Sequence, residues 1–579
     1  MRRNSVIARV RKLGLAFVAC LMFSVLAPMF FAERRSEEHF AGSSVLASPR
    51  DRLELTVPVK LSDTPDLTLV RGIVSDYGPA AAGGTMSHLV LEAPVFSLNA
   101  AAVRASSKTV QGGPDGIEDL AALFPLVRQL VAQSFERMTI RRGTLNITMA
   151  NGSVVTLKEI EAEVSWRGGQ IDTKGSFTVR GQRVAFVATL GQPLDRKGTL
   201  RRPLHATFKG SLIQGSFDGQ LDLVPDLQLT GTTEISTSSL RRIGRWFGIP
   251  LEGTDGFNAA TVKAELTWAR RVLAFEKARL TVDGSEANGR VVLNLGAERP
   301  LIDATLDFSE LDLTPHLDAA RLQLFGFELP GTSWPSFDIS LPMIRYLDAD
   351  LRISARKVML KGHAFGQGAA AITASAGKLQ ADITELELGS GILSAQITAI
   401  MTETVPKYAL RAKIEGIDAG QASTLLLGAA VLTGRATVTA DLTSTGYTLH
   451  EIVGRLRGKA SLALPEGGRV ALDAKALSQA AKTGAYGWTK LARAPASVDK
   501  LDVLADVYNG IAFPEKVEVR SGNLTLAASG RLDLDDGYMD MRLTWKPIPQ
   551  ADQPPRPADA GGETVSLRGP WYAPIVRLE

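Results

Sequence analysis

The sequence predicts a mainly β protein with a few helices and one N-terminal transmembrane helix. Three observations lead to this fold class: apolar and polar residues alternate through most of the chain, helical patterns are few, and an uncharged run stands near the start. The 579 residues allow three or four domains or one long repetitive array. With 45% hydrophobic and 22% charged residues, the composition is that of a folded protein and excludes global disorder.

The N-terminus has the pattern of a membrane anchor. Residues 1–12 hold five basic side chains and no acidic one, and residues 13–32 form an uncharged, largely apolar run. About 20 residues, rising ~1.5 Å each, cross the ~30 Å hydrocarbon layer of a bilayer. The positive-inside rule keeps residues 1–12 in the cytoplasm and sends the rest across. We expect a single-pass protein of the bacterial inner membrane, with its bulk in the periplasm.

A cleaved signal peptide is the alternative for this segment. Ala32 would suit position −1 of a cleavage site, but Phe30 at position −3 is bulky, and the apolar run is longer than a usual signal core. The body of the chain is exported in both cases. The single cysteine, Cys20, lies inside the run, which excludes a disulfide framework and leaves the exported part without a thiol.

The net charge of +4 comes from the N-terminus. Outside residues 1–12 the chain carries 60 basic and 61 acidic side chains. A near-neutral body offers no basic patch of the kind that neutralises nucleic-acid phosphates. The charge therefore argues against a nucleic-acid partner.

The body is predicted to be a series of short strands. Strict alternation marks clear strands at residues 261–268, 302–308, 347–356, 435–442, 524–532 and 539–546, with a terminal pair near 565–567 and 575–577. Turn signals separate such runs, among them Asp283-Gly284, Asn288-Gly289, Gly467-Gly468 and Asp536-Gly537. The pattern predicts roughly 20 to 25 strands, each with one apolar and one polar face.

Helical patterns are few. We expect helices at residues 116–137 and 238–247, a weaker one at 472–491, and a stiff Pro-rich linker within 547–557. We divide the chain into a basic cytoplasmic segment, an anchor, two β-rich regions, and a last segment of Pro-rich linker and terminal strands. These occupy residues 1–12, 13–32, 33–300, 301–545 and 546–579.

Three helices cannot cover the apolar faces of so many strands. Large exposed apolar patches are rare unless something binds there. The strands could pack as sandwiches, which are common in all-β chains, or close as a membrane barrel. They could also curl into an open groove whose inner face meets an apolar ligand. The barrel is disfavoured, because such barrels carry aromatic girdles and the anchor would hold this chain at the inner membrane.

The sequence offers no recognisable catalytic motif. His450-Glu451 begins like a zinc-protease helix, but Gly454 stands where the second histidine belongs. Nucleophile elbows and phosphate loops are not found, and the paired carboxylates are interpreted as parts of solvated strand faces and turns. These pairs are Asp348 with Asp350 and Asp533 with Asp535. We therefore expect no catalytic, cofactor-binding or metal-binding residues and no enzyme, with a periplasmic enzyme of scattered site residues as a weaker alternative.

An ordered set of characteristic segments follows the anchor, densest over residues 347–475 and sparse over residues 51–115. The segments include Ser134 to Thr148, Leu301 to Pro315, Leu347-Asp-Ala-Asp-Leu-Arg-Ile-Ser-Ala355, Ile414-Glu-Gly-Ile-Asp418, Leu456-Arg-Gly458 and the strand-rich end from Val517 to Leu534. With this anchor and this set of segments, the chain resembles the AsmA family of bacterial inner-membrane-anchored proteins.

Members of this family are regarded as relatives of chorein-type, bridge-like lipid transfer proteins. The resemblance implies a long repeating antiparallel β-groove with an apolar lining, and a role in phospholipid traffic and outer-membrane integrity. The partners that it implies are phospholipid acyl chains, the inner membrane through residues 13–32, and outer-membrane components. It implies no catalytic residues.

Strand alternation predicts which residues would line such a groove. We expect the lining at Leu347, Ala349, Leu351, Ile353, Ala436, Val438, Ala440, Leu442, Leu524 and Leu526. The alternative function is a structural or interaction module that assists outer-membrane protein assembly without carrying lipid.

Overall fold

A computed structural model gives the fold of the chain. It describes residues 53–55, 59–63, 66–77, 88–99, 137–148, 154–196, 199–222, 228–247, 256–269, 272–294, 299–316, 334, 336, 339, 341–345, 347–401, 404–427, 429–471, 477, 479, 481, 482, 488, 496–522, 524–547, 564–571 and 573–578. The predicted anchor, the predicted helix at 116–137 and the Pro-rich linker lie outside the described residues. Within them, no helix has the length and hydropathy that a bilayer crossing requires.

The described chain is mainly β, as the alternation predicts. It contains 35 strands, more than the sequence pattern suggested. The clear predicted strands are confirmed as β13 (Ala260–Ala269), β16 (Leu301–Phe308), β18 (Asp348–Ala355), β26 (Arg435–Thr445), β32 (Leu524–Asp533), β33 (Tyr538–Pro547), β34 (Thr564–Pro570) and β35 (Ile575–Leu578).

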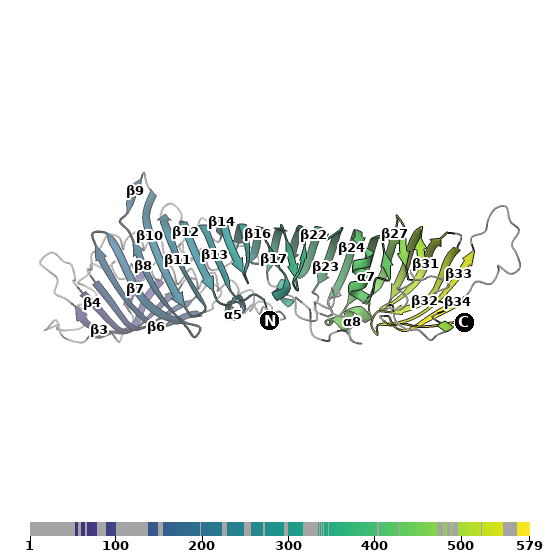
Figure 1. The fold of residues 1–579 in the computed structure, drawn as a ribbon. Coiled ribbons are helices and arrows are strands. Elements are labelled where there is room, and N and C mark those ends of the chain that lie inside the picture. Colours follow the sequence, from purple (N-terminus) through teal and green to yellow (C-terminus); the bar gives the residue numbers. More distant parts are fainter. Residues whose placement is uncertain are drawn as a thin grey trace, which may run out of the picture. The chain divides into compact units, whose positions relative to one another are not determined.

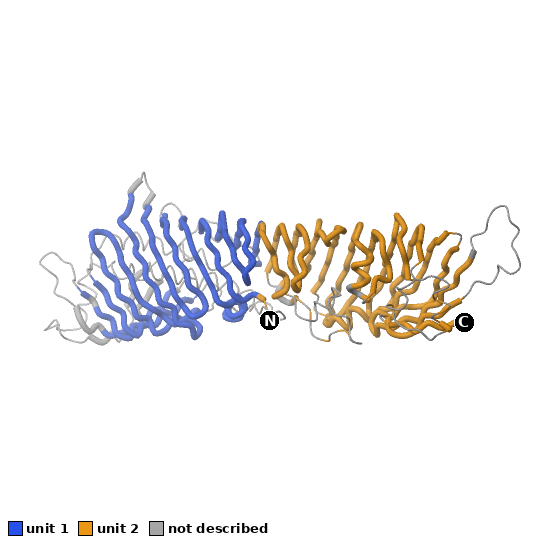
Figure 2. The backbone as a smooth tube through the Cα atoms, viewed as in Figure 1, with its two compact units in different colours: residues 1–252, 257–305 blue, residues 253–256, 306–579 orange. Residues whose placement is uncertain are grey.

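The chain forms two compact units, coloured separately in Figure 2. Unit 1 comprises residues 1–252 and 257–305, and unit 2 comprises residues 253–256 and 306–579. Residues 253–256 thus belong to unit 2 although they lie within the sequence of unit 1.

Unit 1 is built on a large sheet in which most strands pair with their sequence neighbours (Figure 1). Besides β13, its strands are β1 (Leu53–Leu55), β2 (Val59–Asp63), β3 (Asp66–Tyr77), β4 (His88–Asn99), β5 (Arg137–Thr148), β6 (Val154–Arg167), β7 (Gln170–Val179), β8 (Gln182–Leu190), β9 (Leu194–Arg196), β10 (Thr199–Gly210), β11 (Ile213–Asp222), β12 (Gln228–Thr237), β14 (Val272–Val282) and β15 (Ser285–Asn294).

The expected antiparallel arrangement is wrong at one place in unit 1. Strands β4 and β5 pair in parallel, with Leu91 opposite Ile140. Parallel neighbours need a crossover connection of about a dozen residues or more, and residues 100–136 separate these two strands. Alternation sets the two faces of a strand but not its direction, so the sequence pattern could not reveal this pair.

Unit 2 has a large antiparallel sheet and two three-stranded ones. Its further strands are β17 (Leu311–Asp312), β19 (Val358–Leu360), β20 (His363–Phe365), β21 (Gly368–Ser375), β22 (Lys378–Leu388), β23 (Gly391–Ile400), β24 (Lys407–Asp418), β25 (Leu432–Thr433), β27 (Arg457–Leu464), β28 (Gly468–Val470), β29 (Ala496–Val498), β30 (Lys500–Tyr508) and β31 (Ile511–Ser521). The large sheet runs in the order β18, β21, β22, β23, β24, β26, β27, β30, β31, β32, β33, β34, β35. In one small sheet, β17 and β19 pair in parallel.

The helices are short. Helix α5 (Leu240–Phe247) confirms the pattern at 238–247, and the residues described within 472–491 are helical at 477, 479, 481, 482 and 488. Helices α7 (Ala419–Leu427) and α8 (Leu449–Gly454), with 3₁₀ turns η3 (Thr314–His316) and η4 (Pro342–Arg345), were not predicted. Such short elements give too few turns for a periodic signal.

One predicted turn is wrong. Asp283-Gly284 has positive φ at both residues and closes the hairpin between β14 and β15. Asn288-Gly289 lies inside β15 instead, paired with Arg279 and Ala278. The preceding turn already fixes the hairpin, so cross-strand pairing overrides the local turn preference.

Candidate binding face

A row of small side chains crosses the large sheet of unit 2. Directly paired residues of antiparallel strands point to the same face. Along eight consecutive strands, β18 to β30 in sheet order, these pairs place on one face Ile353, Ala370, Ile383, Ala395, Ala412, Ala440, Ala460 and Ala505. We call this row the alanine row, after its six alanines. At ~4.8 Å between strands, it extends about 34 Å across the sheet.

Larger aliphatic side chains flank the alanine row on both sides. One flanking row contains Leu351, Ile372, Ile397, Leu410 and Leu442. The other contains Leu386, Leu393, Ile414, Val438 and Leu462. Because alanine methyl groups project less far from the sheet than the branched side chains of the two flanking rows, the alanine row forms a shallow depression along the middle of the face.

This apolar face is only partly buried. Every side chain of the alanine row is half-buried, and Ile397 beside it is 37% exposed. Isolated apolar residues at a surface are ordinary, but a contiguous set across eight strands is not. The middle of the unit 2 face is therefore accessible to an apolar partner.

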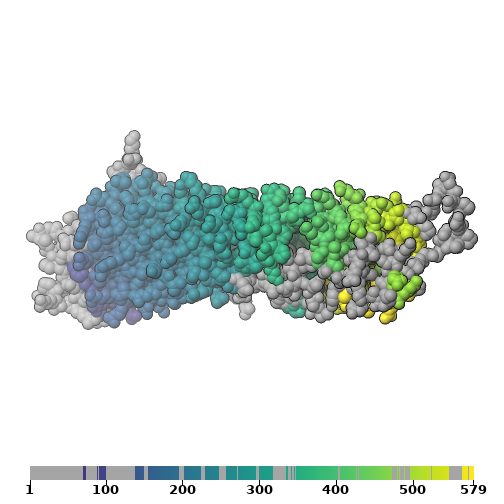
Figure 3. Space-filling view, viewed as in Figure 1, coloured from purple at the N-terminus to yellow at the C-terminus, as the bar shows by residue number. Residues whose placement is uncertain are grey.

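The corresponding face of unit 1 is buried. An equivalent row of paired residues is between 0% and 8% exposed, namely Met138, Val164, Thr173, Ala188, Ala206, Phe217, Thr233 and Ala264. Phe177 and Phe186 add ring packing, with centroids 5.8 Å apart. Figure 3 shows one side of unit 1 (blue to teal) in a space-filling view. The same alternation of apolar and polar residues thus corresponds to a buried apolar face in unit 1 and to a partly exposed apolar face in unit 2.

Both ends of the unit 2 strands are covered. At one end, Ile344 and Leu341 of the η4 segment pack on Ala374, Ala399 and Met401. At the other end, and over the last strands, a larger core contains Leu464, Leu477, Trp488, Leu526 and Trp545 among its buried residues. In the described part of unit 2, the partly exposed middle of the apolar face therefore lies between two buried hydrophobic clusters.

The structure brings most of the predicted lining residues onto this face. Ala349, Leu351 and Ile353 of β18 and Ala436, Val438, Ala440 and Leu442 of β26 share it by register. Ala436 and Leu526 are each 2% exposed and Leu524 packs on the same core, so these three lie under the covered part. Leu347 precedes β18 and is half-buried. The alignment of alanines from six different strands was not predicted, because it depends on register.

The opposite face of the same strands is polar. Its rows carry surface ion pairs such as Arg411 with Asp441 at 3.2 Å, and Lys459 with Glu515 at 2.8 Å. Hydrogen bonds from Gln380 and Gln396 lower the pKa of Asp382 on this face. Exposed pairs of this kind add little stability, but they keep this face in water.

Unit 1 has an open cavity of about 750 Å³ on its polar face. Strands β5 to β8 and β10 to β12 line it, and its charged side chains include Lys174 and Glu163, paired at 2.7 Å. Val187 in its lining is 54% exposed. The cationic and anionic side chains of the lining balance, so this cavity shows no preference for a ligand of one charge.

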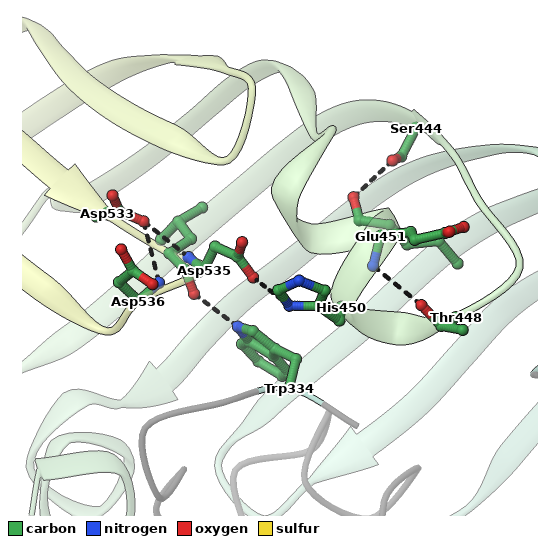
Figure 4. Close-up of polar contacts among 10 residues, drawn as sticks. Trp334, Ser444, Thr448, His450, Glu451, Asp533, Asp535 and Asp536 are labelled. Atoms are coloured by element: carbon green, nitrogen blue, oxygen red, sulfur yellow. Dashed lines mark hydrogen bonds and ion pairs between the residues drawn. The ribbon is translucent and has the colours of Figure 1, made fainter. Parts of the chain in front are cut away.

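Two histidine–carboxylate contacts occur among the described residues: the exposed pair His205 with Asp218 on strands of unit 1, and a partly buried pair beside α8 (Figure 4). His450 Nδ1 is 3.1 Å from Asp535 Oδ1. Burial raises the pKa of Asp535 above its usual range, although His450 opposes the shift. Trp334 Nε1 donates to the carbonyl of Leu534 at 2.7 Å, and Asp533 accepts from two backbone N–H groups of its own turn. These contacts tie the β32–β33 turn to α8 and to residue 334.

This cluster holds no recognisable catalytic constellation. Thr448 caps α8 by accepting from Glu451 N, and Ser444 Oγ donates to Ile452 O at 2.6 Å, so both hydroxyl groups serve the backbone of α8. Among the described residues, no group of three or more His, Cys, Asp or Glu side chains could hold a metal ion. The geometry gives the cluster a tethering role.

Comparison with protein-family models, with curated proteins and with solved structures finds no match for this chain.

Proposed function

We propose that this chain is an AsmA-like protein, anchored in the inner membrane by residues 13–32, that guides phospholipids along an apolar β-groove in the periplasm and supports outer-membrane biogenesis and integrity. The observation that carries the proposal is the half-buried apolar face of unit 2, with its alanine row between two aliphatic rows. The groove would run along this row.

Acyl chains fit this surface by size and chemistry. Each CH₂ group removed from water contributes roughly 0.8 kcal/mol, so a chain lying along the row would be held without any polar contact. A path of about 34 Å is longer than one extended acyl chain. Because the methyl groups of the row repeat from strand to strand, successive positions would have similar energies, which allows movement along the row.

Site-specific photo-crosslinking in living cells tests this function with the full chain. A photoreactive amino acid at Leu442, on the apolar face, should capture phospholipid. The same amino acid at Thr443, exposed on the opposite face of β26, is the matched control. Phospholipid captured equally from both positions, or from neither, would contradict the proposal.

A structural or interaction module is the second candidate. The observation that favours it is the buried row of unit 1, whose described residues are at most 8% exposed and so offer little surface to a ligand. A chain that assists assembly without carrying lipid would give protein adducts from the exposed strand faces and no lipid adduct from Leu442.

A further inference from the structure

The alanine row contains one unbroken stretch of alanines. They follow one another on the neighbouring strands β23, β24, β26, β27 and β30 (Figure 1), and they are Ala395, Ala412, Ala440, Ala460 and Ala505. We call this stretch the five-alanine trough. At ~4.8 Å between strands it is about 19 Å long. An acyl chain in one leaflet spans ~15 Å, half of the ~30 Å hydrocarbon layer, so the trough has room for one such chain along its length.

A larger side chain stands in register at each end of the trough. Ile383 of β22 pairs with Ala395 at one end, and Pro514 of β31 pairs with Ala505 at the other. Both are half-buried. Ala370 follows Ile383 on β21, so this isoleucine interrupts a row of alanines that continues beyond it. The trough is therefore bounded by side-chain volume at both ends.

The backbone is irregular at the same two strands. Strand β22 shifts register against both of its neighbours, β21 and β23, next to Ile383. Strand β31 shifts against β30 next to Pro514, and against β32 over the segment that contains it. A bulge bends its strand and is one of the few places inside a sheet that accept a proline. The pairs that join the five alanines are regular, so the ends of the trough differ from its middle in backbone as well.

The trough is one side chain wide. Branched residues stand beside it in both flanking rows, among them the pair Ile397 with Leu410 on one side and the pair Leu393 with Ile414 on the other. A depression of this width takes one extended hydrocarbon chain. Two chains side by side would have to displace the branched side chains.

We propose that the five-alanine trough binds a single acyl chain of ordinary membrane length, and that Ile383 and Pro514 are the stops at its ends. This inference rests on the proposed function, because it specifies which part of the lipid the apolar face holds. A chain within the trough contacts methyl groups beneath it and branched side chains on both sides. A longer chain has to lie over Ile383, which lifts it away from the sheet. The site therefore selects lipids by chain length, and movement past Ile383 is the slow step along the row.

Competitive transfer of two phosphatidylcholines tests Ile383 as a stop. The full chain is reconstituted in donor vesicles with equal amounts of a short-chained lipid, dipalmitoleoyl-phosphatidylcholine, and a long-chained one, dinervonoyl-phosphatidylcholine. The two lipids share a headgroup and have one double bond in each chain. Mass spectrometry of the acceptor vesicles gives the ratio of long-chained to short-chained lipid transferred, after exchange without protein has been subtracted.

Ile383→Ala should raise this ratio about tenfold. The substitution joins the trough to Ala370 and lengthens it by two strand spacings, about 10 Å. A tenfold gain corresponds to about two further CH₂ groups of the long chain in apolar contact. Ala395→Ile moves the stop one strand inward instead, and it should lower transfer of the short-chained lipid several-fold. It decides the matter if Ile383→Ala does not fold, which far-ultraviolet circular dichroism reveals.

Ile392→Ala is the matched control. Ile392 lies on β23, pairs with Glu415 and is 48% exposed on the face opposite Ile397. Loss of the same atoms there should leave the ratio at the value of the parent. A folded Ile383→Ala that transfers both lipids in the ratio of the parent would overturn the stop and leave the proposed function standing. Transfer of neither lipid by the parent would instead refute the proposed function itself.

Discussion

Ala412 and Ala440 lie directly opposite each other on β24 and β26, and both methyl groups are half-buried on the apolar face of unit 2. Both residues belong to the alanine row, which lies between the two rows of larger side chains. Side-chain volume at these two positions sets how deep an acyl chain could lie.

Filling the alanine row should block lipid movement without unfolding the protein. In the variant Ala412→Leu with Ala440→Leu, the added atoms displace about two CH₂ groups of a bound chain. At ~0.8 kcal/mol each, this loss corresponds to about tenfold in affinity. Transfer of a fluorescent phospholipid between vesicles by the full chain measures the effect. Ala409→Leu, on the opposite face in register with Thr443, is the control and should transfer lipid normally.

A charge on the apolar face should abolish lipid pickup. Val438→Asp places a carboxylate where an acyl chain would lie, and desolvating it costs several kcal/mol. We expect loss of outer-membrane barrier function in cells and of lipid pickup in vitro. Thr443→Asp adds the same charge to the exposed face of the same strand and should change neither. If both variants behave as the parent does, the groove does not include β26.

Arg202 should be essential to the stability of unit 1, whereas its neighbour Arg201 should matter less. Arg202 is 1% exposed and donates to the carbonyl oxygens of Gly191 and Gly169, and burial lowers its pKa to about 10. Arg202→Ala leaves two carbonyl groups without a donor and should cost about 2 to 4 kcal/mol of unfolding free energy.

Arg201 provides the matched control for that substitution. Its guanidinium is partly exposed and pairs with Asp222 at 2.5 Å. Arg201→Ala should cost less than Arg202→Ala because the Arg201 guanidinium is itself 40% exposed, although the substitution leaves the Asp222 carboxylate, which is 13% exposed, without its ion-pair partner. Urea unfolding followed by tryptophan fluorescence compares the two variants, and equal losses would show that burial of Arg202 is not the cause.

Glu518 should make part of the stability of unit 2 depend on pH. The hydrogen bond from Lys500 lowers the pKa of Glu518, with help from Arg520 and Lys516. A pKa lowered on folding stabilises the folded state above the unfolded-state pKa, and this contribution is lost as pH falls through the folded-state value. Glu518→Gln should therefore lower the melting temperature near neutral pH, and the difference from the parent should vanish in acid. A difference that is the same at every pH would contradict this assignment.

The period-two pattern identified which residues of one strand share a face. It placed Ala349, Leu351 and Ile353 together, and likewise Ala436, Val438, Ala440 and Leu442, because successive side chains of any strand point to opposite sides. The same pattern gave the mainly β class and located most clear strands within one or two residues. The uncharged apolar run at residues 13–32 separately indicates an anchor, which stays a prediction.

The tertiary structure alone decided which strands are neighbours and which faces are covered. Ala412 and Ala440 meet through pairing register, His450 meets Asp535 across 85 positions of sequence, and β4 pairs in parallel with β5. Alternation in unit 1 and in unit 2 looks alike, yet Met138 is fully buried and Ala440 is half-buried. Alternation is a local property of one strand, whereas register and coverage depend on contacts between residues far apart in the chain.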